Sequence, residues 1–309
     1  MAARSRKGQI VAMRTRDFGI HRPIVSMSMR TRVKRCTIED LPKSLLLSVT
    51  GEIRNYTTSL FLNGHLLGSG TFISWRDHHG ILTAEHVTNN PYRRDHCLNF
   101  SHDSKQAIQL MLADYSHIFS LEARTLANIT LDKRGTEEWG PDLSVIVVPP
   151  GDKLNAIKAR KSFWSLTVGS AEKLRTALIQ KGFVAIVGHP GEQMSSENPK
   201  PDGIVLSPQM VGITVQKRYI VHEDYDYVDV ESLHSDRTKA PASYKGVSGG
   251  SFWRVPIAPK SKTDPTLDHA RPQLLGVPFF QSDEIGGRRF VRGHGPRSIY
   301  ENLLGKLGV

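Results

Sequence analysis

Three polar residues lie next to apolar runs that are predicted to be strands, and strand formation alone does not require a polar residue at these positions. His86 follows a predicted hairpin, Asp142 opens a run of aliphatic residues, and Ser248 lies in a glycine-rich turn. Taken singly, each has an ordinary explanation as a satisfied polar residue, a turn cap or a loop serine. Taken together, they supply a base, an orienting carboxylate and a nucleophile, which are the groups that covalent acyl transfer requires.

The glycines around Ser248 suit the same chemistry. A serine nucleophile needs an exposed hydroxyl, and backbone N–H groups must point at the carbonyl oxygen that becomes negative. Both demands require a tight and sterically open backbone, which Gly246, Gly249 and Gly250 provide. The turn therefore has the backbone that a reacting serine would need.

The elements that must position these residues are mostly short strands. From residue 44 onward, apolar runs alternate with Gly, Pro, Asn and Asp, and their spacing suits a β-barrel or a β-sandwich. The runs predicted as strands include Leu45–Val49, Leu60–Leu62, Leu66–Trp75, Ile81–Ala84, Ile108–Leu112, Val145–Val148, Phe183–Val187, Val211–Val215, Tyr219–His222 and Gln273–Phe280.

A terminal helix and two long loops complete the predicted elements. Aliphatic residues recur at every fourth position of residues 297–307, which predicts a short amphipathic helix. Residues 190–203 and 256–272 are rich in Pro, Ser and charge, so both are predicted to be surface loops.

These segments resemble the chymotrypsin/trypsin-like serine peptidases, and are most like the bacterial HtrA-type branch. The resemblance lies in the glycine-serine-glycine turn at 68–70 with the run Leu82–His86, in the strand Asp142–Val148, and in the Gly-x-Ser-Gly-Gly turn Gly246–Gly250. The chain order His, Asp, Ser is that of chymotrypsin. The match spans residues 60–281, which is most of the chain.

The resemblance implies an all-β fold of two six-stranded antiparallel β-barrels with a C-terminal helix. A basic arm of residues 1–40 would precede a peptidase domain of residues 41–309. Within that domain, barrel one would take about 41–160, barrel two about 161–296 and the terminal helix 297–307.

The resemblance also implies a role for each candidate residue. Ser248 would be the nucleophile, His86 the general base and then acid, and Asp142 the carboxylate that fixes the imidazole tautomer. The N–H groups of Gly246 and Ser248 would form the oxyanion hole. The reaction would pass through an acyl-enzyme that water then hydrolyses.

The chain departs from the family in its activation features. Val247 stands where trypsin-type zymogens carry an acid, and no basic residue directly precedes Ile10 or Ile24, so activation by cleavage is not expected. We therefore expect activity to be constitutive or switched by a regulatory protein partner. HtrA-type proteins usually add a PDZ module, but the 61 residues after Ser248 are needed to finish barrel two and the helix.

The specificity pocket is predicted from three positions. The residue six places before the nucleophile is Ala242, which is neutral and small and argues against selection of Lys or Arg. Phe279 or Phe280 near the pocket wall would narrow the site. A small or apolar preferred residue follows from these side chains.

The basic character of the chain is concentrated in its N-terminal arm. The 309 residues carry a formal net charge of +11, and residues 1–36 hold +9 of it, with ten Lys and Arg against Asp17 alone. Clustered basic residues favour polyanions. Phe18 is the only aromatic residue among them, however, and base stacking would need more. We expect a solvated leader, with docking to nucleic acid, an acidic partner or an anionic membrane as the alternatives.

Composition also bears on the compartment. The chain has only Cys36 and Cys97, which favours a reducing environment. No run approaches the roughly 18 apolar residues of a membrane span, and the N-terminus lacks a secretory apolar segment. We expect a cytoplasmic protein. An organelle transit peptide is the alternative, because the arm is rich in Arg and poor in acids.

The sequence therefore predicts a serine endopeptidase that hydrolyses peptide bonds in a protein or peptide substrate under the control of a partner. The alternative is a catalytically silent trypsin-fold scaffold that binds through its basic arm. Neither a cofactor nor a metal is expected, because the neighbouring histidines show no HExxH or paired CxxC spacing; these are His78, His79, His86 and His96.

Overall fold

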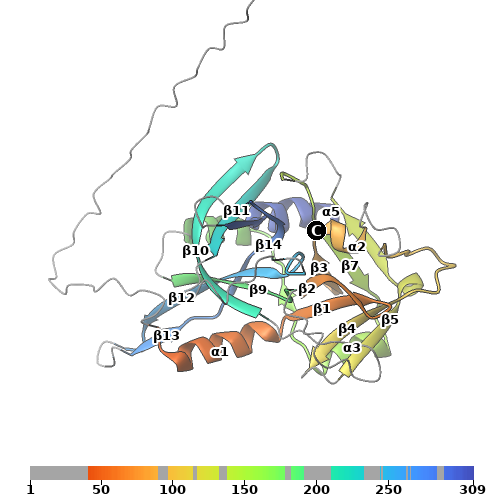
Figure 1. The fold of residues 1–309 in the computed structure, drawn as a ribbon, viewed down its shortest axis with the longest axis horizontal. Coiled ribbons are helices and arrows are strands. Elements are labelled where there is room, and N and C mark those ends of the chain that lie inside the picture. Colours follow the sequence, from red (N-terminus) through yellow and green to blue (C-terminus); the bar gives the residue numbers. More distant parts are fainter. Residues whose placement is uncertain are drawn as a thin grey trace, which may run out of the picture. The chain divides into compact units, whose positions relative to one another are not determined.

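In the computed structural model, the described residues all belong to the second of two units, Ile38–Val309. The residues that it describes are 41–89, 97–113, 117–131, 138–177, 182–190, 210–232, 244, 246–261, 264, 266–283 and 289–309. The predictions for the basic arm, for most of the loop at 190–203 and for Ala242 lie outside the described residues. Figure 1 shows the strands and helices of the second unit.

The first sheet is antiparallel and has the strand order β5-β4-β1-β2-β3-β7-β6, while β8 pairs in parallel with β2. Figure 1 shows it in orange to yellow on the right. Its strands are β1 (Thr57–Leu62), β2 (His65–Trp75), β3 (His78–Thr83), β4 (Ala107–Ala113), β5 (His117–Glu122), β6 (Ala127–Thr130), β7 (Ser144–Val148) and β8 (Trp164–Ser165).

The second sheet has the order β13-β12-β14-β15-β11-β10-β9, and a further pairing of β9 with β12 closes it into a ring. Figure 1 shows these strands in green to blue on the left. They are β9 (Gly182–Gly188), β10 (Met210–His222), β11 (Tyr225–Ser232), β12 (Ser251–Pro259), β13 (Leu267–His269), β14 (Gln273–Gln281) and β15 (Phe290–His294).

The predicted chymotrypsin-like fold is confirmed in its main features, which are two antiparallel β-sheets and a C-terminal helix. The second sheet forms a closed ring, whereas the pairings among the described residues leave the first sheet open. The terminal helix comprises η6 (Ser298–Leu303) and α5 (Leu304–Lys306). At the start of this helix, the buried Asp226 carboxylate accepts hydrogen bonds from the N–H groups of Arg297 and Ser298 at 2.9 and 2.7 Å.

The prediction of a strand at Leu45–Val49 is wrong, because this run lies in helix α1 (Lys43–Arg54). Leu45, Val49 and Ile53 are buried and recur at every fourth position, which places them on one helical face. A run of five residues, four of them apolar, is too short for its composition to separate strand from helix; the spacing of the buried residues over the longer segment distinguishes the two.

Each of the other runs predicted as a strand coincides with a strand, although β1 and β3 begin three residues earlier than predicted. Two further differences concern the second sheet. The runs 211–215 and 219–222 belong to the single long strand β10. The predicted loop at 256–272 contains a hairpin, because β13 pairs with Ile257–Pro259 at the end of β12. The helices α3 (Asp152–Lys158) and α4 (Ser170–Ala177) were not predicted.

An apolar core joins the two sheets. It is formed by α1, by the inner faces of both sheets and by the terminal helix, including Ile73, Leu82, Val187, Trp253 and Leu303. Burial of this surface from water stabilises the contact at roughly 25 cal/mol per Å². The strand ends that carry the candidate residues therefore meet on a packed support.

Candidate active site

His86 and Asp142 come from the ends of two paired strands. His86 lies in the one-turn helix α2 (Glu85–Thr88), directly after β3, and Asp142 lies just before β7. Because β3 and β7 are antiparallel, the end of β3 faces the start of β7, with Thr83 opposite Ser144. The register alone brings the two segments together, although they are 56 residues apart in sequence.

Two hydrogen bonds join His86 to the Asp142 carboxylate. His86 Nδ1 lies 2.5 Å from Oδ2, and the His86 backbone N–H donates to Oδ1 at 2.9 Å. With Nδ1 donating to the carboxylate, Nε2 is the nitrogen left to accept a proton. This is the tautomer that a general base requires.

The electrostatics of Asp142 favour its charged form. Burial of the carboxyl opposes ionisation, but the charge of His86 and its two hydrogen bonds outweigh this cost, with a smaller contribution from His294. The net result lowers the pKa of Asp142. A carboxylate that stays ionised can stabilise an imidazolium beside it.

Ser248 lies in the turn that precedes β12, and the first sheet supports this turn. The Ser69 N–H donates to the Ser248 carbonyl at 2.9 Å, and Ser69 Oγ donates to the Gly246 carbonyl at 2.7 Å. Gly249 has φ of 77°, and a Cβ there would overlap Thr83 Oγ1. The turn thus packs against the end of β3, close to the start of α2.

Backbone N–H groups in this turn fall into two kinds. Those of Val247, Gly249 and Gly250 donate to the carbonyl oxygens of Tyr244, Pro278 and Val247 at 2.8 to 2.9 Å. In the part of the chain that the structure describes, the N–H groups of Gly246 and Ser248 have no acceptor. These two are the donors that the sequence assigns to an oxyanion hole.

The structure therefore relates the three predicted residues unequally. His86 and Asp142 are joined directly, whereas Ser248 lies against the segment that precedes His86.

The predicted pocket residues are placed only in part. The ring of Phe279 is buried and stacks on His294, with 4.7 Å between the ring centres. Phe280 is half-buried at the end of β14. Because Ala242 lies outside the described residues, the preferred substrate residue stays a prediction.

Sequence reasoning missed His294, which lies behind Asp142. This histidine is fully buried at the end of β15, and its Nε2 accepts a hydrogen bond from the Asp142 N–H at 2.9 Å. Burial lowers the pKa of His294 to about 4, although Asp142 and Asp226 oppose the shift. Gly140 permits the approach, because its φ is 62° and a Cβ would lie 3.2 Å from Nε2. No motif marks this residue in the sequence.

Two kinds of feature are absent from the described residues. They contain no group of three or more His, Cys, Asp and Glu side chains arranged to hold a metal ion. In the same residues, no helix combines the length and the apolar character needed to cross a membrane.

Solved structures similar to this chain include two proteases. The Rv3671c protease in its inactive form is 14% identical, with a TM-score of 0.42 over 87% of this chain and 96% of that one. The HtrA-type protease AlgW with a decapeptide is 11% identical, with a TM-score of 0.46 over 85% and 67%.

A third similar structure comes from work on coupled folding and binding of the Sesbania mosaic virus VPg protein. It is 14% identical, with a TM-score of 0.42 over 81% of this chain and 90% of that chain. No protein-family model matches this chain, and no curated protein matches it.

Proposed function

We propose that this protein is a serine endopeptidase in which Ser248, His86 and Asp142 act together. The observation that carries the proposal is the paired contact of His86 with the Asp142 carboxylate, at 2.5 Å from Nδ1 and 2.9 Å from the backbone N–H. One contact orients the imidazole ring and the other fixes the main chain beside it. Holding the His86 ring in one orientation favours catalysis, because Nε2 must accept a proton and later return it.

In this mechanism, Ser248 Oγ attacks the carbonyl carbon of the scissile peptide bond while His86 Nε2 takes the hydroxyl proton. The N–H groups of Gly246 and Ser248 stabilise the negative oxygen of the tetrahedral intermediate. The C–N bond then breaks, the imidazolium gives its proton to the leaving amine, and an acyl-enzyme remains. Water attacks this ester with the same base, which releases the acid and restores Ser248.

Partner control and a cytoplasmic location belong to the same proposal. Val247 is buried in the turn where a zymogen would carry an acid, so a freed amino terminus has no carboxylate to pair with at that position. A protein partner that orders the site would replace this activation step.

The catalytically silent scaffold is a second candidate. The observation that favours it is that Asp142 is hydrogen-bonded to both His86 and His294, contacts that would stabilise the fold without any turnover. In this alternative the triad residues support the fold, and binding takes place through the basic arm.

A covalent probe separates the two candidates. The wild-type chain should react with a fluorophosphonate, and Ser248→Ala should abolish labelling and lower kcat for a small ester by on the order of 10⁶-fold. Ser101→Ala is the matched control, because Ser101 is exposed and its side chain has no role at the site. Labelling of the wild type is measured with and without cell extract. If it never exceeds that of Ser248→Ala, the peptidase proposal is wrong; full activity without extract contradicts partner control.

A further inference from the structure

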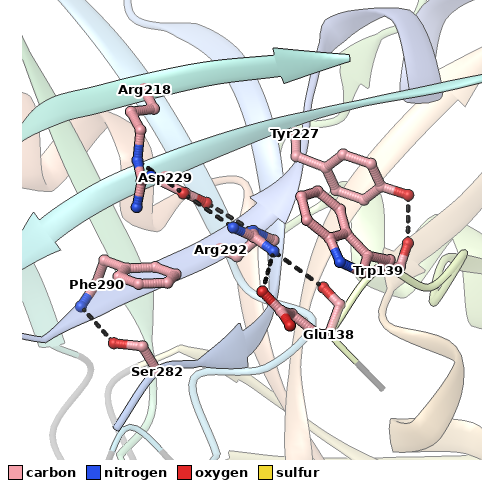
Figure 2. Close-up of polar contacts among 8 residues, drawn as sticks. All are labelled: Glu138, Trp139, Arg218, Tyr227, Asp229, Ser282, Phe290 and Arg292. Atoms are coloured by element: carbon pink, nitrogen blue, oxygen red, sulfur yellow. Dashed lines mark hydrogen bonds and ion pairs between the residues drawn. The ribbon is translucent and has the colours of Figure 1, made fainter. Parts of the chain in front are cut away.

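The segment that carries Asp142 lies just before β7 of the first sheet, yet several of its polar contacts are made with the second. We call residues 138–142 the Asp142 loop. Tyr227 Oη donates to the Trp139 carbonyl, and Arg292 Nη1 donates to Glu138 Oε1 at 3.0 Å (Figure 2). The Asp142 N–H donates to His294 Nε2 at 2.9 Å. The loop is therefore held at three successive points by one face of the second sheet.

Strand register places these three residues of the second sheet side by side. On paired strands β11 and β15, Tyr227 lies opposite His294, and Asp229 lies opposite Arg292. Side chains two positions apart on a strand point to the same face, so Tyr227 and Asp229 share a face, as do Arg292 and His294. The contacts to the loop follow from the sheet itself and not from a flexible connection.

Arg292 is held rigidly within this face. Its guanidinium forms a two-pronged ion pair with the buried Asp229 carboxylate, at 2.8 and 3.1 Å, and lies 4.1 Å from the centre of the Trp139 ring (Figure 2). The side chain is only 3% exposed. A planar guanidinium in such a pair fixes direction as well as charge.

Burying the His294 ring costs free energy, and a role for its acceptor nitrogen would account for that cost. Its ring is fully buried and packs against Phe279 and Tyr227, at 4.7 and 5.2 Å between ring centres. Its Nδ1 has no hydrogen-bond partner among the described residues. A buried polar atom without a partner costs free energy, and an apolar side chain would avoid that cost. What an apolar side chain cannot do is accept the Asp142 N–H.

We propose that His294 is a positioning residue. Its imidazole belongs to the second sheet and holds the main chain of Asp142. The second sheet thereby fixes the direction from which the Asp142 carboxylate approaches His86. This inference rests on the proposed peptidase function. His294 does not touch substrate in this arrangement; it acts through Asp142.

Two substitutions at His294 test the proposal. His294→Leu removes the acceptor, while His294→Gln retains one on a side chain of similar reach. We expect His294→Leu to lower kcat for a small ester by ~10- to 100-fold with little change in KM, because small errors of catalytic geometry are costly. His294→Gln should recover most of the loss. Val291→Ala, at a buried site on the same strand, controls for lost stability.

A second readout does not depend on turnover. Titration of the His86 ring by NMR should give a lower midpoint in His294→Leu than in the wild type, because a displaced carboxylate stabilises the imidazolium less. If His294→Leu does not fold, Tyr227→Phe is used, since it removes the hydrogen bond to Trp139 and should shift both readouts in the same direction by less.

The outcomes distinguish the two proposals. A wild-type chain that never reacts with the fluorophosphonate overturns the peptidase function, and the His86 titration still tests the role of His294. Wild-type kcat and an unchanged His86 midpoint in folded His294→Leu overturn the positioning role. An equal loss of kcat in Val291→Ala overturns it as well, because the effect would then follow stability alone.

Discussion

The two sheets hold Asp142 in different ways. The first sheet holds its carboxylate through His86, whose side chain is 33% exposed. The second sheet holds its main chain through His294, which is fully buried. A group that exchanges protons with a substrate must stay accessible. A group that sets geometry gains from burial, because packing removes its freedom and a low dielectric strengthens its hydrogen bond.

The same contrast separates two of the acid–base pairs, His86–Asp142 and Arg292–Asp229. The His86–Asp142 pair contains an imidazole, a group that has both a neutral and a charged form. In the Arg292–Asp229 pair the guanidinium is permanently charged; burial works against the charge, but the Asp229 contacts prevail and raise the pKa of Arg292. The first pair is suited to chemistry, and the second is suited to holding the sheet against the Asp142 loop.

The largest expected effect is on the accessible side of Asp142. Asp142→Asn should lower kcat by roughly 10⁴-fold while the fold is kept, because the amide no longer holds the imidazole in the required tautomer. Steady-state kinetics with a small ester and a thermal melt measure both properties. The matched control is Asp152→Asn, at an exposed position in the first turn of α3. A loss of less than tenfold would contradict the role of Asp142.

The next effect is on the buried side. Arg292→Leu leaves the buried Asp229 carboxylate with only Arg218, at 3.6 Å, and should lower the free energy of unfolding by up to about 3–5 kcal/mol. Replacing both residues by Leu should restore much of it, because no uncompensated charge remains. Urea unfolding measures the free energy of unfolding of the wild type, the single variant and the double variant. A single variant as stable as the wild type would show that this pair does not hold the sheet.

The smallest effect is the response of the buried side to acid. The pKa of His294 is about 4 in the folded chain, so the unfolded chain binds the extra proton first as pH falls below about 6.5. Stability is therefore lost between about pH 6.5 and 4, by at most roughly 3 kcal/mol from this residue. Burial similarly lowers the pKa of His189 to about 3, and adds to the loss.

His294→Gln isolates this contribution. The groups facing the ring are Asp142 beside β7, Asp226, Tyr225 and Tyr227 on β11, and Phe279 on β14; the two carboxylates favour the charged ring, and burial outweighs them. Urea unfolding at several pH values should show a shallower acid loss in the variant. If the stability of the wild type and of His294→Gln falls equally with pH, His294 is not held neutral by burial.

Much of the strand pattern was predictable because strands and tight turns leave local traces. The hairpin between β1 and β2 turns at Asn63 and Gly64, whose φ values of 51° and 80° suit the Asn-Gly pair. Helix α1 was missed because its spacing was read over five residues, where helix and strand look alike. The contacts of His294 and Arg292 with the Asp142 loop had no local trace, because Asp142 and Glu138 lie more than 150 residues away.

The sequence by itself determined which residue types are available for chemistry and in what order they occur. A reacting serine needs glycine beside it, and the glycines that meet this requirement lie in the same five-residue turn as Ser248. Only the tertiary structure decided that the antiparallel register of β3 and β7 joins His86 to Asp142, and that β15 places His294 behind it. Pairing between distant strands depends on the packing of the whole sheet, and no short stretch of sequence specifies it.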